Sequence, residues 1–97
     1  MNARTKALAI SKEVKEAVYK RDRGRCILCG AVGLPEAHYI PRSKGGLGIE
    51  QNIVTLCRPC HDRLDNSTER KALLLRVKEH LELWYGDFPD EQRKFKK

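Results

Sequence analysis

Residues 37–66 read AHYIPRSKGGLGIEQNIVTLCRPCHDRLDN, and we interpret the rest of the chain outward from this stretch. It contains two of the three histidines, two of the four cysteines and a loop rich in glycine. Its CRPC motif, residues 57–60, has a counterpart upstream in CILC, residues 26–29. Two Cys-x-x-Cys pairs in one small chain are typical of a tetrahedral zinc site, whose four thiolates leave no position open for substrate. We therefore predict a structural zinc ion with four ligands: Cys26, Cys29, Cys57 and Cys60.

Other interpretations of the cysteines remain open. A redox-active Cys-x-x-Cys motif would need only one pair and usually accompanies a βαβ pattern, which this sequence lacks. The cysteines could instead be free buried thiols, or His61 could replace one of them to give a site of three cysteines and one histidine. Zinc is favoured because both pairs occur in one short chain.

The composition is that of one small, basic domain. The chain has 97 residues, a formal net charge of +7 and 34% charged residues. A chain this short buries a modest core, so a structural metal is one way to supply the missing stability. The excess of Lys and Arg favours an anionic polymer as partner, most often nucleic acid, over a surface that is charged only for solubility.

The apolar pattern excludes a membrane protein. No apolar run approaches the roughly 20 residues that cross a bilayer. The first ten residues, MNARTKALAI, lack the apolar region of a secretion signal. We therefore expect a cytoplasmic location, where disulfides are rare and four cysteines indicate metal binding or catalysis.

The local signals predict a single domain over residues 1–97. Its expected segments are a flexible N-terminus (1–10), a helix (11–23), a zinc-knuckle and ββα core (26–66), a second helix (67–85) and a polar tail (86–97). Ser11 can cap the first helix and Gly24 can end it. Asn66 is expected to cap the last helix, with Glu69 three residues further on.

Within the core, strands are expected at residues 36–40 and 53–56. The first is bounded by Pro35 and Pro41, and the second, IVTL, is β-branched and apolar. The two should pair antiparallel across the glycine-rich loop. Arg58 and Pro59 then open a short helix, because proline is tolerated in the first turn. The result is a ββα unit held by zinc.

The central stretch also holds the groups that phosphodiester hydrolysis needs: a base, a cation site and anchors for phosphate. His38 can act as the base because imidazole titrates near neutral pH. His61 and Asp65 are four residues apart on a helix, so they share a face and together suit Mg²⁺, Mn²⁺, Co²⁺ or Ni²⁺. The amide of Asn52 can hold the loop and thereby His38. The candidate phosphate contacts are Arg42, Lys44 and Arg58.

Taken singly, these residues have simpler interpretations. His38 could be a strand histidine with its hydrogen bonds satisfied, Asn52 a turn residue and Asp65 a helix cap. The basic loop residues could be solvated surface charges. The order in which they occur together favours a functional site.

That order resembles the HNH endonuclease family, a group of ββα-metal nucleases. Three motifs carry the resemblance: CILC at 26–29, HYIPRSKGG at 38–46 and NIVTLCRPCH at 52–61. It implies an α+β fold with a small ββα-metal (His-Me finger) core and a four-cysteine zinc site, flanked by N-terminal and C-terminal helices. Zinc-stabilised, single-domain nucleases of phages and prophages are the most similar members.

The resemblance also implies a role for each site residue. His38 would be the general base, Asn52 would hold the loop and orient that base, and His61 would bind the catalytic divalent cation. Asp65 matches a position where members often carry a second ligand. The implied activity is metal-dependent endonuclease cleavage of double-stranded DNA, nicking one strand with little sequence preference, by a monomer or weak dimer.

One position departs from the family pattern. Many members carry Asp or His as a metal ligand immediately before the general base, where this chain has Ala37. A backbone carbonyl or Glu36 could contribute instead, although strand alternation turns Glu36 and Ala37 to opposite faces. The departure supports an alternative function, a non-catalytic zinc-containing module that binds nucleic acid or phage packaging proteins.

Overall fold

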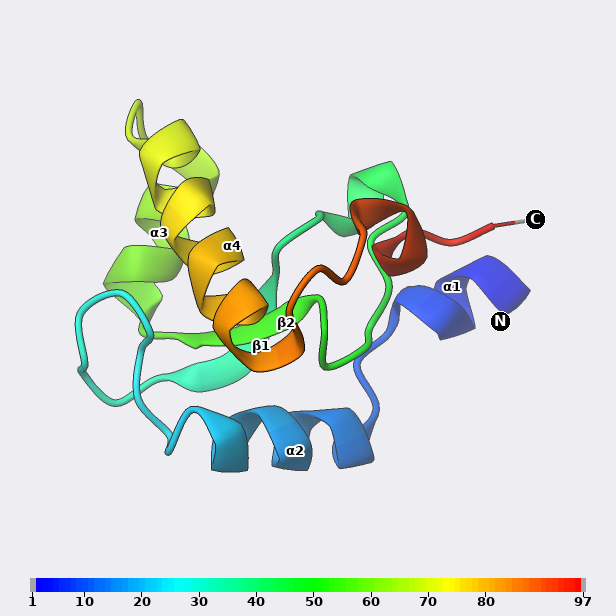
Figure 1. Cartoon of the computed structure of the whole chain (residues 1–97), viewed down its shortest axis with the longest axis horizontal. Coiled ribbons are helices and arrows are strands. Elements are labelled where there is room, and N and C mark those ends of the chain that lie inside the picture. The colour runs from blue at the N-terminus through cyan, green and yellow to red at the C-terminus, as the bar shows by residue number, and fades with distance from the viewer. Residues whose placement is uncertain (1, 97) are drawn as a thin grey trace.

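The computed structural model describes residues 2–96 and has an α+β architecture (Figure 1). Its elements, with η marking a 3-10 helix, are α1 (Ala3–Leu8), α2 (Lys12–Arg21), β1 (Leu34–His38), η1 (Arg42–Lys44), β2 (Ile53–Leu56), α3 (Arg58–Asn66), α4 (Arg70–Tyr85) and η2 (Asp90–Arg93). β1, β2 and α3 form the ββα unit, which confirms the predicted fold class. Among residues 2–96, no helix is both long enough and apolar enough to cross a bilayer.

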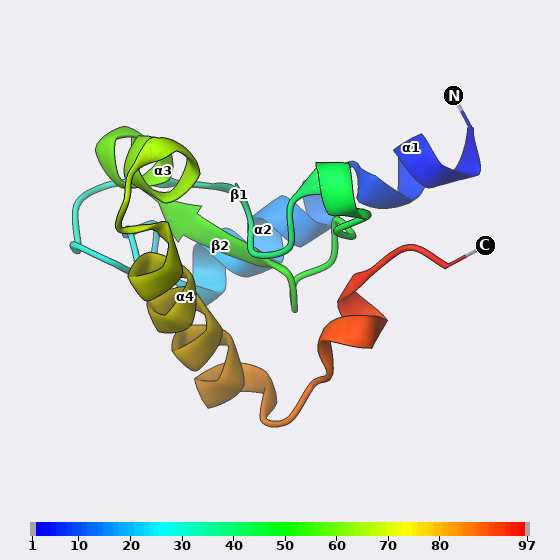
Figure 2. The same cartoon turned by 90° about the horizontal axis from the view of Figure 1, so that it is seen from above.

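The sheet is a hairpin of β1 and β2 that lies between two helical layers. Its strands run antiparallel, with Ala37 opposite Val54 and His38 opposite Ile53. α2 lies along one side of the hairpin, and α3 and α4 lie on the other (Figures 1 and 2). All four residues of β2 are buried, which explains its continuous run of apolar and β-branched residues.

β1 is shifted from its predicted position. The sequence predicts a strand over 36–40, whereas β1 spans Leu34–His38 and contains Pro35. Proline is tolerated there because a two-stranded sheet leaves β1 with an open edge and the register is irregular at this point. The strand ends early because the side chain of Asn52 bonds the backbone N–H and C=O of Ile40.

The junction between α3 and α4 also differs from the prediction. Asn66 is the last residue of α3 and does not cap α4. Ser67 has an extended backbone that breaks the helix, and its Oγ accepts the Glu69 N–H at 3.1 Å. α4 therefore begins at Arg70, later than the predicted start at residue 67.

The segment before α2 is helical where the sequence predicts a flexible N-terminus over 1–10. The Asn2 side chain caps α1 by accepting the Thr5 N–H at 2.8 Å, and Leu8 is only 2% exposed. A single buried leucine gives no helical stripe, so its packing could not be recognised from periodicity. Ser11 then caps α2, as predicted.

The polar tail contacts the domain through the buried Arg93 side chain and through backbone hydrogen bonds to the glycine-rich loop. The Arg93 side chain is 1% exposed and donates to the Gln51 and Phe88 carbonyls and to Asp90. Its guanidinium lies 5.5 Å from the centroid of the Tyr39 ring and 5.1 Å from that of Phe88. An arginine can anchor a polar segment in this way because its flat apolar faces pack while its edges donate hydrogen bonds.

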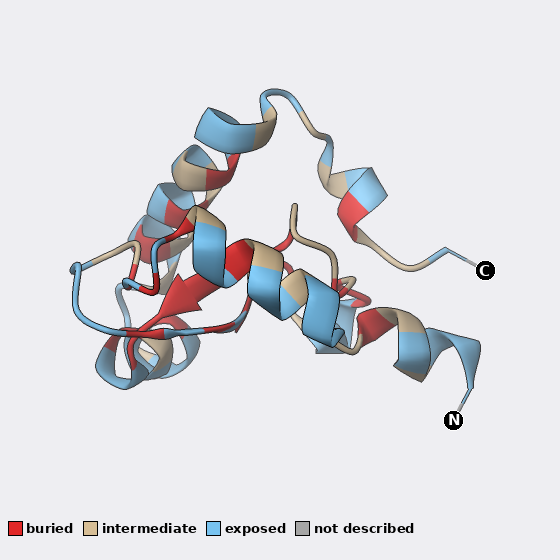
Figure 3. Ribbon diagram, turned by 90° about the horizontal axis from the view of Figure 1, so that it is seen from below, coloured by how far each residue is buried: buried red, intermediate tan, exposed pale blue. Residues whose placement is uncertain are grey.

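The buried residues are concentrated along the hairpin (Figure 3). One buried carboxylate, Asp22, connects α2, β2 and α4. Asp22 accepts hydrogen bonds from the Arg21 guanidinium, the Thr55 backbone N–H and His80. Burial alone would raise the pKa of Asp22, but the His80 and Arg21 bonds outweigh it and lower that pKa to about 2. Asp22 is therefore ionised at neutral pH.

Replacing this carboxylate should destabilise the domain. Asp22→Ala leaves the Arg21 side chain, only 5% exposed, without its partner, and we expect the free energy of unfolding to fall by about 3–5 kcal/mol. Urea unfolding followed by far-UV circular dichroism measures the change. Asp62→Ala, at an exposed acid on α3, is the matched control and should shift stability by less than about 0.5 kcal/mol. Equal unfolding midpoints for the two variants would contradict the stabilising role of Asp22.

Candidate metal centre and active site

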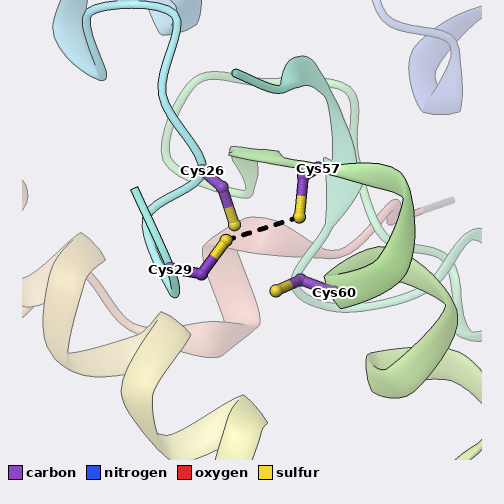
Figure 4. A group of neighbouring side chains, drawn as sticks. All are labelled: Cys26, Cys29, Cys57 and Cys60. Atoms are coloured by element: carbon purple, nitrogen blue, oxygen red, sulfur yellow. Dashed lines mark hydrogen bonds between the residues drawn. The ribbon is translucent and has the colours of Figure 1, made fainter. Parts of the chain in front are cut away.

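Four cysteine side chains converge from two distant segments of the chain (Figure 4). Cys26 and Cys29 lie in the loop after α2, and Cys57 and Cys60 lie at the start of α3. The four sulfur atoms are all within 4.8 Å of one another, and those of Cys29 and Cys57 are 3.5 Å apart. Thiolates that bind zinc tetrahedrally at about 2.3 Å stand about 3.8 Å from one another, so the cluster fits one zinc ion.

The backbone of each knuckle aims its thiols inward. Gly30 has a φ of 82° and donates its N–H to the Cys26 carbonyl at 2.8 Å, a turn that only glycine forms without strain. In the second knuckle, Cys57 occupies the cap position of α3 and its carbonyl accepts the His61 N–H at 2.9 Å. Cys60 therefore lies in the first helical turn, on the same side as Cys57.

The surroundings favour a bound cation over free thiols. Burial and the three neighbouring thiols raise the pKa of Cys60 to about 12, whereas backbone hydrogen bonds outweigh burial and lower the pKa of Cys26 to about 7. Four thiolates this close together repel one another, so they need a positive charge between them to ionise together. Among residues 2–96, the group of ligand atoms close enough to share an ion consists of these four cysteines. His61 is not part of it, so the interpretation with three cysteines and one histidine is not supported.

Two of the three predicted catalytic residues, His38 and His61, meet at a separate cavity of about 300 Å³. Its lining includes His38 from β1, Arg42 from η1, and His61 and Asp65 from α3. A smaller neighbouring cavity of about 120 Å³ shares His61 and adds Arg58. Two of the three predicted phosphate contacts thus flank the histidines.

The third predicted phosphate contact lies apart from these cavities. Lys44, at the end of η1, is exposed. It is absent from both cavity linings in the described part of the chain. A contact between Lys44 and phosphate would therefore be made outside the two cavities.

His38 is half-buried, and one ring nitrogen is engaged. Its Nε2 lies 3.0 Å from the backbone carbonyl oxygen of Leu8, the last residue of α1. Burial lowers the pKa of His38, and the positive charge of Arg42 and the proximity of His61 lower it further against the opposing effect of the Leu8 bond. The imidazole is therefore neutral at pH 7 and able to accept a proton.

His61 and Asp65 form a nitrogen and oxygen pair on one face of α3. The His61 Nδ1 and Asp65 Oδ2 atoms are 3.4 Å apart, and both side chains are partly exposed toward the cavity. Two cis ligands on an octahedral ion, each at about 2.1 Å, stand about 3.0 Å apart. The pair therefore fits two positions of one divalent cation.

Asn52 is fully buried and supports the site without lining it. Its amide nitrogen donates to the Ile40 carbonyl at 3.2 Å and to the Leu47 carbonyl at 2.9 Å. Its amide oxygen accepts the Ile40 N–H at 2.9 Å. These bonds join the end of the glycine-rich loop to the chain two residues after His38, the bracing contact that the sequence predicts.

The departure at Ala37 has a structural explanation. Ala37 is 1% exposed and packs in the core, so its side chain faces away from the cavity. Glu36 lies on the opposite face and lines the cavity together with His38 and His61. Strand alternation therefore turns these two residues to opposite faces, and the carboxylate is the one on the functional side.

A family model described as HNH endonuclease matches residues 26–73. The chain belongs to the HNH endonuclease family. The match includes both knuckles, the hairpin, all of α3 and the first turn of α4. No curated protein matches the chain.

One contact of this HNH domain escaped sequence reasoning. The Leu8 carbonyl that bonds His38 lies outside residues 26–73, in the segment that was expected to be flexible. A backbone carbonyl has no sequence signature, because every residue carries one. The one sequence signal is the single leucine in MNARTKALAI, and one apolar side chain is weak evidence that the segment packs on the domain.

Loss of the four-cysteine cluster should unfold much of the HNH domain. Zinc sites of this type contribute on the order of 10 kcal/mol to folding in zinc-finger peptides, and three of the four cysteines here, Cys26, Cys57 and Cys60, belong to the core itself. We expect Cys57→Ser to lose bound zinc and most of its helical circular dichroism signal. Arg58→Ala, next in the chain, should retain both. A Cys57→Ser protein with unchanged zinc content and melting temperature would contradict the zinc assignment.

Proposed function

We propose that this HNH protein is a divalent-metal-dependent DNA endonuclease that nicks one strand with little sequence preference. The observation that carries the proposal is the 300 Å³ cavity that His38, Arg42, His61 and Asp65 line together. A base, a cation site and a phosphate anchor are the groups that phosphodiester hydrolysis requires. In this chain they come from three different elements and face the same space.

In this proposal His38 is the general base. It is neutral at pH 7 because its pKa is lowered, first by burial, so it can take a proton from the attacking water. Asn52 is the residue that holds the backbone beyond His38 in place, through its two bonds to Ile40. Arg42 binds the phosphate on the side of η1, and Arg58 on the side of the zinc knuckle.

His61 and Asp65 are the proposed ligands of the catalytic cation, which is Mg²⁺, Mn²⁺, Co²⁺ or Ni²⁺ by its donor set. When bound, such a cation stabilises the negative charge that develops on the phosphate and the leaving oxygen. Glu36 is the available third ligand because it lines the same cavity and its ion pair with Lys15, at 3.8 Å, is exposed and weak. The three ligand groups do not lie within 4.8 Å of one another, so at least one of the three side chains must change rotamer to complete the site.

The proposed substrate is double-stranded DNA bound through its backbone. The net charge of +7 supports contacts with phosphate. Arg42, Lys44 and Arg58 are the proposed contacts, and these are side chains that neutralise phosphates and carry little sequence information. One ββα site cuts one strand at a time, so a monomer would nick, and cleavage of both strands would need a weak dimer or two encounters.

Cleavage of supercoiled plasmid tests the function directly. With Mg²⁺ or Mn²⁺, the wild type should produce nicked circles, and His38→Ala should be slower by about 10²–10⁴-fold because it lacks the base. His80→Ala is the matched control, because this histidine bonds Asp22, away from the cavity. At temperatures where the variant is folded, it should nick plasmid at the wild-type rate. Equal rates for wild type and His38→Ala would refute the assignment of the base.

Metal dependence tests the proposed third ligand. Glu36→Gln removes a carboxylate from the cavity, so the Mn²⁺ concentration that gives half the maximal nicking rate should rise by roughly tenfold or more. Glu16→Gln, at an exposed glutamate on α2, is the control and should leave that concentration unchanged. An identical Mn²⁺ dependence for the two variants would remove Glu36 from the ligand set.

The non-catalytic module is the competing outcome. Because the missing ligand at Ala37 motivates it, its decisive measurement is cation binding near His61, observed as Mn²⁺-induced broadening of the His61 resonances with DNA present. Absence of such broadening at high Mn²⁺, together with intact plasmid, would favour a zinc module that only binds nucleic acid.

A further inference from the structure

The first helix is bonded to the candidate active site at three points. The Leu8 carbonyl lies 3.0 Å from His38 Nε2, and the neighbouring Ala7 carbonyl accepts the Gly48 N–H at 3.0 Å. Arg4 reaches across to the Arg42 carbonyl at 3.3 Å. α1 and the glycine-rich loop lie at the same end of the molecule in both views (Figures 1 and 2). The base, its loop and a phosphate anchor are therefore all attached to one short helix.

The segment after α1 packs closely against the backbone of the glycine-rich loop. A Cβ atom added to Gly48 would stand 2.0 Å from the Ala9 carbonyl oxygen, so only glycine allows the two backbones to approach so closely. Leu8 is 2% exposed and anchors the end of α1 beneath this contact. Ala9 and Ile10 then form part of the wall of a cavity that also contains His38 and Arg42.

The contact at His38 determines where the ring carries its proton. A carbonyl oxygen can only accept, so the hydrogen bond requires a proton on Nε2. In a neutral imidazole the other nitrogen, Nδ1, then has the free lone pair. The hydrogen bonds of residues 2–96 leave Nδ1 without a protein partner, and His38 lines two cavities.

We propose that α1 is a positioning element of the active site, which fixes the tautomer and orientation of His38 through the Leu8 carbonyl. The proposal rests on the nuclease function above and extends the catalytic unit beyond residues 26–73. α1 touches no reacting atom itself. It acts through His38, and its own attachment depends on Leu8 and on the bare backbone of Gly48.

The first measurement needs no activity. Long-range ¹H–¹⁵N correlation spectra of the zinc-loaded, ¹⁵N-labelled full chain distinguish a protonated from an unprotonated ring nitrogen, and His38→Ala assigns the His38 signals. We expect the wild type to show a protonated Nε2 and an unprotonated Nδ1. A variant lacking residues 1–10 should show a mixture of tautomers. A wild-type ring with its proton on Nδ1 would overturn the proposal.

The second measurement is the single-turnover nicking rate at saturating protein. Removal of residues 1–10 and Leu8→Ala should each slow nicking by roughly 10–100-fold, the usual cost of a misplaced catalytic group, while zinc content stays unchanged. Lys6→Ala is the matched control, because it removes an exposed charge of α1 and keeps the Leu8 anchor. It should retain the wild-type rate and His38 signals.

Gly48→Ala keeps the proposal testable if the shortened chain does not fold. Its methyl group should push the segment after α1 away and produce the same mixed tautomers and slower nicking. Wild-type signals and rates in folded, zinc-loaded variants would show that α1 only packs, and faster nicking would show that it obstructs the site; either result overturns the proposal. If the wild type itself cuts no DNA, the nuclease function fails, whereas the tautomer spectra still decide the role of α1.

Discussion

The four-cysteine cluster is the constraint on which the candidate site depends. The Cys29 and Cys57 sulfurs are 28 residues apart in the chain and 3.5 Å apart in space, and a core this small could not hold the intervening loops without such a fixed point. The cluster also includes Cys57, the residue that caps the start of α3. Because His61 follows Cys60 directly, the cysteine cluster lies next to the proposed ligand of the catalytic cation.

Features that depend on neighbouring residues could be predicted from the sequence. The Cys-x-x-Cys spacing predicts the cluster, the run IVTL predicts β2, and the spacing of His61 and Asp65 predicts their shared face. Each of these follows from the period of a helix or strand, or from the reach of one turn. The ββα unit is therefore encoded in local sequence patterns.

Features that depend on distant partners could not be predicted. His80 bonds Asp22 across 58 positions of sequence, and Arg93 bonds the Gln51 carbonyl across 42. Both look like ordinary surface residues in the sequence, because charged side chains are usually exposed. The shift of β1 has the same origin: the amide of Asn52 takes the backbone groups of Ile40 that would otherwise have continued the strand.

The two halves of the proposed site are held by different means. His61 and Asp65 lie on α3, whose first turn carries Cys60 of the four-cysteine cluster, whereas His38 ends a strand that is held by hydrogen bonds to Asn52 and to the Leu8 carbonyl. The position of the proposed cation ligands and that of the proposed base are therefore set by separate contacts. Ala37 belongs to the contacts that hold the base: because it is buried opposite Val54, it fixes the strand against the core and turns Glu36 and His38 together toward α3. The alanine at the family's usual ligand position thus determines the side of the strand on which Glu36 and His38 face the cavity.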